Sequence, residues 1–350
     1  MPVFNHPEYD AHETVAFHHH AASGLKAIIA VHNTHLGKGL GGCRMWPYES
    51  DDAALTDVLR LSRGMTYKAA LAGLNQGGGK SVIIGDPRRD KTPAMMRAMG
   101  DFVNALGGQY VAAEDSGTSV ADIRVMAERT RFVGGLADDR SVAAGRTGDP
   151  SPATARGVFI GLKATVKARF GRDDLKGLKV AVQGLGNVGY RLCAYLHQAG
   201  ARLWVTDIHA PAVERCVNEF GAHAVSMEQI FALDADVFAP CALGAVINDL
   251  TIPQLKVKAV AGAANNQLAR PDHGMALLER GILYAPDYCI NAGGIIDIYY
   301  EGPGYDENIV NAHLERIGTT LSVIYERARA EHRPTHEIAD RMAEQRFKSI

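Results

Sequence analysis

The sequence lacks the features that would mark a secreted, membrane-bound or nucleic-acid-binding protein. It has only five cysteines in 350 residues, and none forms a C-x-x-C pair, so neither a disulfide framework nor a zinc ribbon is expected. No apolar run reaches the roughly eighteen residues of a membrane-spanning helix, and the N-terminal residues contain no signal-peptide core. The formal net charge is only -2, so nothing predicts binding to nucleic acid or to an anionic membrane. We therefore expect a cytoplasmic protein.

The length and the glycine content indicate an α/β protein with two domains. A chain of 350 residues exceeds the size of one typical core. Its 37 glycines gather at apparent turns between strands and helices, as in α/β proteins whose backbone approaches ligands. The one compositional oddity is His18-His19-His20, which we interpret as an exposed polar turn, because adjacent histidines point in different directions. No metal site is expected.

A glycine run, Gly77-Gly78-Gly79, ends on Lys80 and leads into an apolar segment. Without side chains, the run lets a small ligand approach the backbone closely while Lys80 projects toward it. A nucleotide phosphate loop is excluded, because Leu74 stands where its first glycine belongs. A turn that carries a surface lysine remains an alternative. A second lysine, Lys68, precedes the run, and two amines in one desolvated site would lower each other's pKa.

The first half of the sequence alternates strand and helix signals. Strands are expected at 26–32 and 110–113, with a glycine-rich loop at 37–42. Helices are expected from Ser50, as the cap, to about Lys68, and over 92–106. Asp115 follows the second strand, where open α/β folds place working groups, although a turn residue bonded to its own backbone would look the same.

The second half contains a dinucleotide-binding signature in its required context. Strand 179–183 leads directly into Gly184-Leu185-Gly186-Asn187-Val188-Gly189 and a helix to about 199, and the next strand ends on Asp207. The helix N-terminus would stabilise a pyrophosphate, and Asp207 would accept hydrogen bonds from the adenosine ribose. A carboxylate there would repel the 2′-phosphate of NADP, so NAD is the expected cofactor.

Later segments complete the expected second domain. Strands end near Cys241, Asn265 and Asp287, and helices are expected from 291, over 307–330, and from the cap Thr335 to about 348. From these residues alone, Cys241 is expected to be a small buried filler. We predict a substrate-binding and oligomerisation domain at 1–140, with 332–350 packing back on it. A doubly wound parallel-sheet domain of Rossmann type would occupy 141–331, separated from the first by a deep cleft.

Several motifs in order along the chain resemble the Glu/Leu/Phe/Val amino acid dehydrogenase family, and within it most of all the leucine dehydrogenase branch. They are Gly41-Gly42-Cys43-Arg44-Met45, Met65-Thr66-Tyr67-Lys68, Gly77-Gly78-Gly79-Lys80, Glu114-Asp115, Gly148-Asp149-Pro150-Ser151-Pro152, Gly184 to Gly189, Ala239-Pro240-Cys241-Ala242 and Ala263-Ala264-Asn265-Asn266. The resemblance covers nearly the whole chain.

The resemblance implies reversible, NAD-dependent oxidative deamination of an L-amino acid to a 2-oxo acid and ammonia. Lys68 would bind the substrate carboxylate, Lys80 would activate water as the general base, and Asp115 would shuttle protons. Further substrate-binding residues would be Leu40, Gly41, Gly42, Met65, Ala113, Asn266, Ile295 and Ile298. Cofactor-binding residues would be Thr154, Gly184, Leu185, Gly186, Asn187, Val188, Gly189, Asp207, Cys241, Ala242, Ala263, Asn265 and Asn291.

The resemblance also implies the substrate class and the assembly. Leu40, Ala113, Ile295 and Ile298 are all apolar, which disfavours glutamate and favours leucine, isoleucine or valine. A homo-oligomer, dimer or octamer, is expected, although the chain is shorter at its C-terminus than the family pattern. Asp149 replaces an asparagine of that pattern and adds a negative charge.

Two other functions stay open at this point. A phenylalanine- or tryptophan-type aromatic dehydrogenase would share the catalytic motifs. A catalytically silent NAD-binding regulator would not need Lys68, Lys80 and Asp115 together.

Overall fold

The structure is a computed structural model that describes residues 3–136, 148–302 and 304–348. The chain divides into two compact units. The first consists of Met1–Asp149, Ile298–Tyr305 and Ala343–Ile350, and the second of Pro150–Asp297 and Asp306–Met342. The expected boundary between residues 140 and 141 lies outside the described residues.

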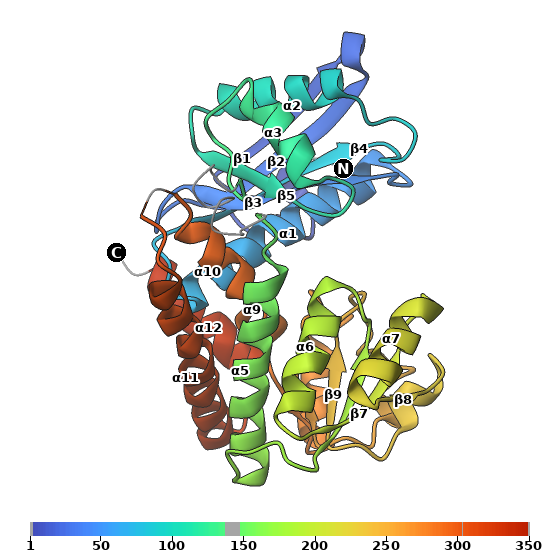
Figure 1. The fold of residues 1–350 in the computed structure, drawn as a ribbon. Coiled ribbons are helices and arrows are strands. Elements are labelled where there is room, and N and C mark those ends of the chain that lie inside the picture. The colour runs from blue at the N-terminus through green and yellow to red at the C-terminus, as the bar shows by residue number, and fades with distance from the viewer. Residues whose placement is uncertain (1–2, 137–147, 303, 349–350) are drawn as a thin grey trace. The chain divides into compact units, whose positions relative to one another are not determined.

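The first unit contains a five-stranded mixed sheet (Figure 1). Its strands lie in the order β1-β2-β4-β3-β5. The first three neighbours pair antiparallel, whereas β3 pairs in parallel with both β4 and β5. The strands are β1 (Thr14–His20), β2 (Leu25–Asn33), β3 (Gly39–Trp46), β4 (Gly77–Ile84) and β5 (Tyr110–Glu114).

Helices cover both faces of this sheet. The side chains of a strand alternate between the two faces, and β2 carries apolar residues on both. Ile28 and Ala30 of β2 pack with α1 (Asp51–Leu71). Ile29 and Val31 instead join the core formed with α2 (Pro93–Ala105) and α3 (Val120–Ala127). The hydroxyl groups of Ser50, Thr92 and Ser119 cap these three helices by accepting backbone hydrogen bonds.

The second unit contains a six-stranded parallel sheet in the order β11-β10-β9-β6-β7-β8. The strands are β6 (Lys179–Gln183), β7 (Arg202–Thr206), β8 (His223–Ala224), β9 (Val237–Pro240), β10 (Ala259–Val260) and β11 (Leu283–Tyr284). The chain order reverses between β6 and β9, which makes their carboxyl ends the switch point where doubly wound folds bind ligands.

The remaining α-helices that the structure describes are α5 (Ser151–Phe170), α6 (Asn187–Gln198), α7 (Ala210–Phe220), α8 (Asp272–Glu279), α9 (Asp287–Ile290), α10 (Gly293–Tyr299), α11 (Glu307–Glu331) and α12 (Thr335–Phe347). Short 3-10 helices occupy Val3–Asn5, Ala21–Ser23, Gln229–Ala232 and Ile252–Gln254. Within the second unit, α5 packs against both α6 and α11 (Figure 1).

Three expectations from the sequence were wrong in detail. His18-His19-His20 is the end of strand β1 rather than a turn, because it pairs with Leu25 to Ala27 of β2. The glycines from 39 to 42 and from 77 to 79 lie inside β3 and β4 rather than in loops. Thr335 does not act as the expected cap, since its hydroxyl donates to the carbonyl oxygen of Tyr284.

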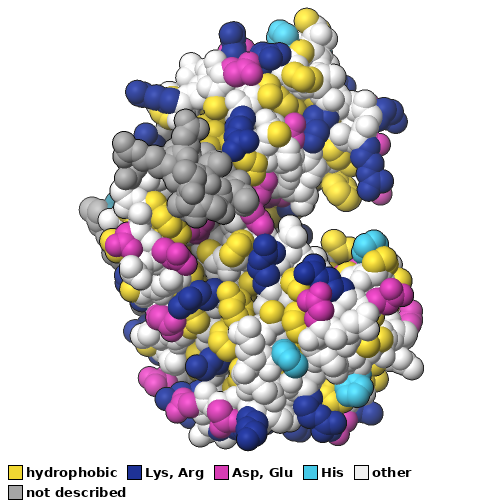
Figure 2. All heavy atoms as spheres, viewed as in Figure 1, with side chains coloured by type: hydrophobic (Ala, Val, Ile, Leu, Met, Phe, Trp, Pro, Cys, Tyr) yellow, Lys and Arg dark blue, Asp and Glu magenta, His cyan; other side chains and the backbone are white. Residues whose placement is uncertain are grey.

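Side chains of both charges are interspersed on the face of the molecule shown in Figure 2, in keeping with the small formal net charge of -2. Among the described residues, no helix is both long enough and apolar enough to cross a membrane.

Candidate active site and dinucleotide site

Lys80 lies in the middle of the first unit's sheet, where its neighbours leave almost no room for side chains. A Cβ on Gly41 of β3 would overlap the carbonyl oxygen of Gly79 on β4, so the two strands can lie this close only because position 41 is a glycine. The hydroxyl of Tyr110 spans the same strands, donating to Gly41 (2.7 Å) and lying 3.0 Å from Ser81 Oγ. Lys80 is consequently 4% exposed, on a strand that cannot shift.

The Lys80 amine pairs with the carboxylate of Asp115, through Nζ and Oδ2. The other carboxylate oxygen, Oδ1, accepts from Nε of Arg44 at 3.1 Å. Nη1 of Arg44 donates to Asp57 at 2.9 Å, and Asp57 also accepts from the hydroxyl of Tyr48 at 2.6 Å. Two cations and two carboxylates therefore alternate along one chain of contacts.

The cations decide the charge of Asp115. Burial alone would raise the pKa of this carboxyl group, but Lys80 and then Arg44 more than offset burial and hold the pKa well below its usual range. The neighbouring Glu114 behaves in the opposite way, because burial and the negative charge of Asp149 raise its pKa. Asp115 is thus a carboxylate in this structure.

The turn after β5 fixes Asp115 in place. Its backbone N–H donates to Thr118 Oγ1 (3.0 Å), and Thr118 in turn donates to the carbonyl oxygen of Cys43 (2.8 Å). A Cβ on Gly42 would lie 2.7 Å from Asp115 Oδ2, so this glycine makes room for the carboxylate. Gly41 and Gly42 therefore shape the site through their missing side chains.

Lys68 and Met65 lie in the last turns of α1, and both are half-buried. The backbone of α1 rests directly on β4, since a Cβ on Gly78 would overlap the backbone nitrogen of Thr66. Lys68 follows Thr66 by two residues and Lys80 follows Gly78 by two. This contact brings the two lysine-bearing segments together.

Three of the four residues expected to line a side-chain pocket lie around the turn at Gly134 and Gly135. A Cβ on Gly134 would lie 3.4 Å from Ile298 Cγ2 and 3.7 Å from Leu40 Cδ1. A Cβ on Gly135 would lie 4.0 Å from the Cβ of Ala113. The surroundings are apolar.

The fourth pocket residue, Ile295, belongs to the second unit, where it is 9% exposed. The segment Ile298–Tyr305 groups with the first unit, and its Glu301 carboxylate accepts from the backbone N–H of Gly135 at 2.6 Å. The strand and helix signals did not indicate this return of the chain, although the family resemblance grouped Ile298 with Leu40 and Ala113.

In the second unit, the turn between β6 and α6 has the geometry of a dinucleotide-binding loop. Gly184 has a φ of +96°, and a Cβ there would lie 2.7 Å from the backbone nitrogen of Ala242. A Cβ on Gly189 would overlap the carbonyl oxygen of Gly184, so the helix packs tightly on the turn. Gly186 faces open space, with no heavy atom within 4 Å of a built Cβ among the described residues.

The start of α6 is open to an anion. Its N-cap, Gly186, provides no side-chain hydrogen bond, and both Gly186 and Asn187 are exposed. Val188 is half-buried in the first turn. A helix begun in this way presents backbone N–H groups and the positive end of its dipole.

Asp207 lies directly after β7, beside this turn. Its carboxylate accepts from the backbone N–H of Leu185 at 2.6 Å and from that of His209 at 2.8 Å. These two bonds hold the carboxylate next to the glycine turn, where a nucleotide ribose would lie in a fold of this kind.

Cys241 and Ala242 follow β9 on the other side of the switch point. The backbone N–H of Cys241 donates to Gln183 at 2.7 Å. Cys241 is half-buried, and burial raises the pKa of its thiol to about 12, which leaves it protonated. This agrees with a filler rather than a nucleophile.

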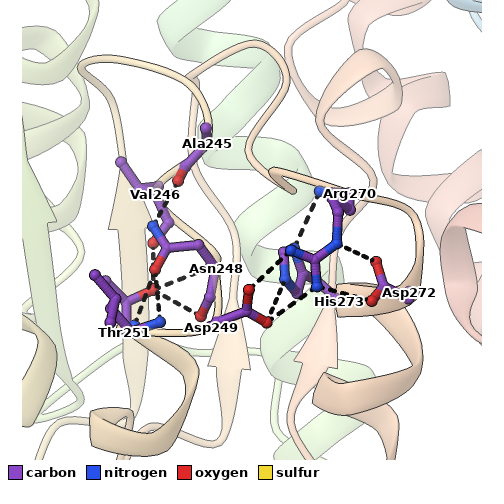
Figure 3. A network of polar contacts seen from close by, with 9 residues as sticks. Ala245, Val246, Asn248, Asp249, Thr251, Arg270, Asp272 and His273 are labelled. Atoms are coloured by element: carbon purple, nitrogen blue, oxygen red, sulfur yellow. Dashed lines mark hydrogen bonds and ion pairs between the residues drawn. The ribbon is translucent and has the colours of Figure 1, made fainter.

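The chain that follows Ala242 is held by the polar network shown in Figure 3, which joins Asp249 to Arg270 and His273. Nη1 of Arg270 donates to Asp249 at 2.8 Å and its Nε donates to Asp272 at 3.1 Å, while Nε2 of His273 lies 3.2 Å from Asp249. The hydrogen bonds from Arg270 and His273 lower the pKa of Asp249 to about 2. The network fastens the loop to the start of α8.

Asn291 links the ends of β10 and α9. Its Nδ2 donates to the carbonyl oxygen of Ala263 (3.0 Å) and to Oδ1 of Asn265 (2.7 Å). Its own Oδ1 is buried and has no hydrogen-bond partner among the described residues. Such an acceptor is suited to a ligand amide.

Asn266 and Thr154 are the remaining expected site residues. Asn266 has a φ of +51° and is held there by Ala245, whose N–H donates to its carbonyl oxygen at 2.7 Å. Thr154 lies in the first turn of α5, and its hydroxyl donates to Pro150 within the same helix at 2.9 Å.

The residues of the second unit fit a dinucleotide. The turn at Gly184 leaves space at Gly186, the start of α6 offers N–H donors, and Asn291 Oδ1 is an orphaned acceptor. A pyrophosphate and a carboxamide N–H are the groups that complement these features.

Arg44, Asp57 and Tyr48 received no role from the sequence, although the first belongs to a family motif. The signal that could have revealed Arg44 is an arginine inside a run of glycine and apolar residues that reads as a buried strand. A buried arginine requires carboxylate partners, and these come from α1 and the turn after β5.

Comparisons with known proteins agree with this architecture. Residues 11–132 match the family description "Glu/Leu/Phe/Val dehydrogenase, dimerisation domain", and residues 145–210 and 207–332 match "Glutamate/Leucine/Phenylalanine/Valine dehydrogenase". The chain is 52% identical over 350 residues to leucine dehydrogenase of Geobacillus stearothermophilus, covering 100% of this chain and 94% of that one. It is 51% identical to leucine dehydrogenase of Bacillus subtilis (strain 168), with 100% and 95% covered.

A crystal structure of L-tryptophan dehydrogenase from Nostoc punctiforme is also similar, with a TM-score of 0.83 and 44% sequence identity over 97% of this chain and 96% of that one. The fold and these matches define the class of protein as an amino acid dehydrogenase. The chain belongs to the Glu/Leu/Phe/Val dehydrogenase family. The family assignment expected from the motifs is confirmed.

Proposed function

We propose that the protein catalyses the reversible, NAD-dependent oxidative deamination of branched-chain aliphatic L-amino acids to 2-oxo acids and ammonia. The observation that carries the proposal is the ion pair between the buried Lys80 and the half-buried Asp115, beside a sheet that also bears the apolar Leu40 and Ala113. The similarity to two leucine dehydrogenases supports the substrate class.

The first unit would hold the amino acid. Lys68, on the helix that rests on β4, would pair with the substrate carboxylate. Lys80 would act as general base on the attacking water, and the Asp115 carboxylate would exchange protons with the substrate nitrogen and with Lys80 Nζ. Since Lys80 and Asp115 already touch, a proton can pass between them without movement of the backbone.

The second unit would hold NAD, which supplies the hydride acceptor when bound. The pyrophosphate would lie at Gly186 and the start of α6, and Asp207 would bind the adenosine ribose. Asn291 Oδ1 would accept from the nicotinamide carboxamide. The Asp207 carboxylate would disfavour the 2′-phosphate of NADP by charge repulsion.

The preference for aliphatic substrate side chains would follow from the apolar residues next to the turn at Gly134 and Gly135. The side chains nearest to Gly134 and Gly135 include those of Leu40, Ala113 and Ile298, which are apolar and would not bind a distal carboxylate. Several branched side chains would be accepted, because one methylene changes binding by only about 1–3 kcal/mol. We propose, as before, a cytoplasmic homo-oligomer, with substrate-binding and NAD-binding domains that correspond to the two units.

The proposal is tested by steady-state rates of NADH formation with NAD, and of NADPH formation with NADP, for leucine, isoleucine, valine, phenylalanine, tryptophan and glutamate. We expect the highest kcat/KM for a branched chain with NAD. A preference for phenylalanine or tryptophan would replace the branched-chain assignment by an aromatic one. Binding of NADH without turnover of any amino acid would favour the silent NAD-binding protein.

A further inference from the structure

Arg44 is a half-buried cation that the mechanism above does not use. Its side chain is 23% exposed and leaves β3 toward two carboxylates that come from different elements. Nε contacts Asp115 at 3.1 Å and Nη1 contacts Asp57 on α1 at 2.9 Å. Since Asp57 also accepts from Tyr48 at 2.6 Å, the guanidinium group is fixed at one end by a partner that is itself fixed.

Asp115 thereby divides its two oxygens between two cations. Oδ2 faces Lys80 and Oδ1 faces Arg44, and the backbone N–H of Ser116 also donates to Oδ1 at 2.6 Å. The negative charge of Asp115 in turn contributes to raising the pKa values of four neighbouring groups, Cys43, Tyr48, Tyr110 and Glu114. Burial is the main cause in each: it raises the pKa of the Cys43 thiol to about 12 and the pKa values of the two phenols above their usual range, so these three groups stay neutral near pH 7.

We propose that Arg44, anchored by Asp57, is a positioning residue that holds Asp115 ionised and oriented, and that sets how tightly Asp115 retains the proton of Lys80. The inference rests on the proposed function, because it assigns Arg44 a part in the same proton transfer. Arg44 touches Asp115 and would act through this carboxylate.

Arg44 and Lys80 both face the Asp115 carboxylate. With Arg44 present, the positive charge of its guanidinium offsets part of the attraction between this carboxylate and the proton on Lys80 Nζ. Without Arg44, no guanidinium charge would oppose the attraction between the Asp115 carboxylate and the proton on Lys80 Nζ. Oδ1 would also lose the contact that fixes the plane of the carboxylate.

A lysine cannot replace Arg44 fully. The guanidinium is a rigid fork whose separate N–H groups reach two carboxylates at once, whereas an ammonium is a point charge on a flexible chain. Arg44→Lys therefore keeps the charge but loses the fixed link between Asp57 and Asp115. Arg44→Met removes the charge and keeps a similar length.

The test compares the dependence of kcat/KM on pH for wild type, Arg44→Met, Arg44→Lys and Asp57→Asn, with leucine and NAD. We expect Arg44→Met to lower kcat/KM at neutral pH by roughly 10- to 100-fold and to move the acid limb upward by about one pH unit or more. Arg44→Lys should bring the acid limb back toward its wild-type pH more than it restores kcat/KM. Asp57→Asn should give values between those of wild type and Arg44→Met. Arg97→Met, which breaks a surface ion pair with Glu128 in the same unit, is the matched control and should behave as wild type.

NADH titration by fluorescence shows for each variant whether the protein is folded and binds cofactor. A uniform loss of rate with an unmoved acid limb in an Arg44→Met protein that binds NADH normally would overturn the inference, and so would wild-type behaviour of Arg44→Met. Should Arg44→Met fail to fold, a wild-type kcat/KM in Arg44→Lys together with an unmoved acid limb in Asp57→Asn would overturn it. Inactivity of the wild type toward every amino acid would instead refute the proposed function.

Discussion

Replacing His32 by glutamine is predicted to remove much of the protein's sensitivity to mild acid. The His32 ring is 4% exposed, with Nδ1 2.8 Å from Thr66 Oγ1 and Nε2 3.5 Å from Asp10 Oδ2. Burial, and next the neighbouring His12 and to a lesser extent Arg63, lower the pKa of His32 to about 4, although Asp10 opposes the shift. The folded protein therefore holds this histidine neutral at a pH where the unfolded chain would protonate it.

The direction and size of the effect follow from this difference. Because the unfolded state binds more protons between about pH 6.5 and pH 4, the contribution of His32 to stability is complete above pH 6.5 and is lost as the pH falls through that window. Between pH 7 and pH 5 the loss amounts to about 2 kcal/mol, from a folded pKa of about 4 and an ordinary value of 6.5. His12, whose pKa burial also lowers, adds to the same trend.

The assay is urea unfolding at pH 7 and at pH 5, compared between wild type and His32→Gln. Glutamine can keep a hydrogen bond to Thr66 but cannot titrate, so the variant should lose about 2 kcal/mol less than wild type on acidification, whatever its stability at pH 7. His19→Gln, which removes an exposed ring on β1, should retain the wild-type loss. Equal acid sensitivity of wild type and His32→Gln would refute the reasoning.

Three further predictions concern the two units. Lys80→Ala should bind NADH normally but lose most turnover, because the general base is gone; near-normal kcat would contradict that role. Asp207→Ala should raise the ratio of kcat/KM with NADP to that with NAD, and an unchanged ratio would mean that this carboxylate does not select the cofactor. Phe347→Ala should lower the free energy of unfolding, measured by urea, by about 3–5 kcal/mol, because the Phe347 side chain is 3% exposed and its ring centroid lies 5.3 Å from that of Tyr67. A change below about 1 kcal/mol would show that the end of α12 does not stabilise the first unit.

Much of the fold could be predicted because its signals are local. The Ser50 and Thr92 caps, the apolar strand 179–183 and the glycine turn after it each specify their element within a few residues. The glycine strands could not be recognised, because glycine favours neither strand nor helix. They form strands here since β3 and β4 must approach to within backbone contact, which only the folded sheet reveals.

The candidate site was accessible only in part for a similar reason. The motifs and the family resemblance placed Lys80 and Asp115 in one site, and in the structure the two side chains form an ion pair. The contact of Arg44 with Asp57 and Asp115 joins β3, α1 and the turn after β5, and no spacing in the sequence announces it. The grouping of Ile298 with Leu40 at Gly134 depends on a return of the chain that begins far from both.

The glycine contacts around Lys80 separate two properties that an engineer would want to vary independently. A Cβ on Gly41 would overlap the backbone of β4, one on Gly78 would overlap the backbone of α1, and one on Gly79 would meet the ring of Tyr110, so larger residues at these positions would displace their neighbours. Leu40 and Ala113, by contrast, meet their surroundings through side chains that can be trimmed or exchanged. Variant libraries intended to change the substrate should therefore keep the glycines and vary Leu40 and Ala113. The backbone that positions Lys80 and Asp115 would then stay unchanged.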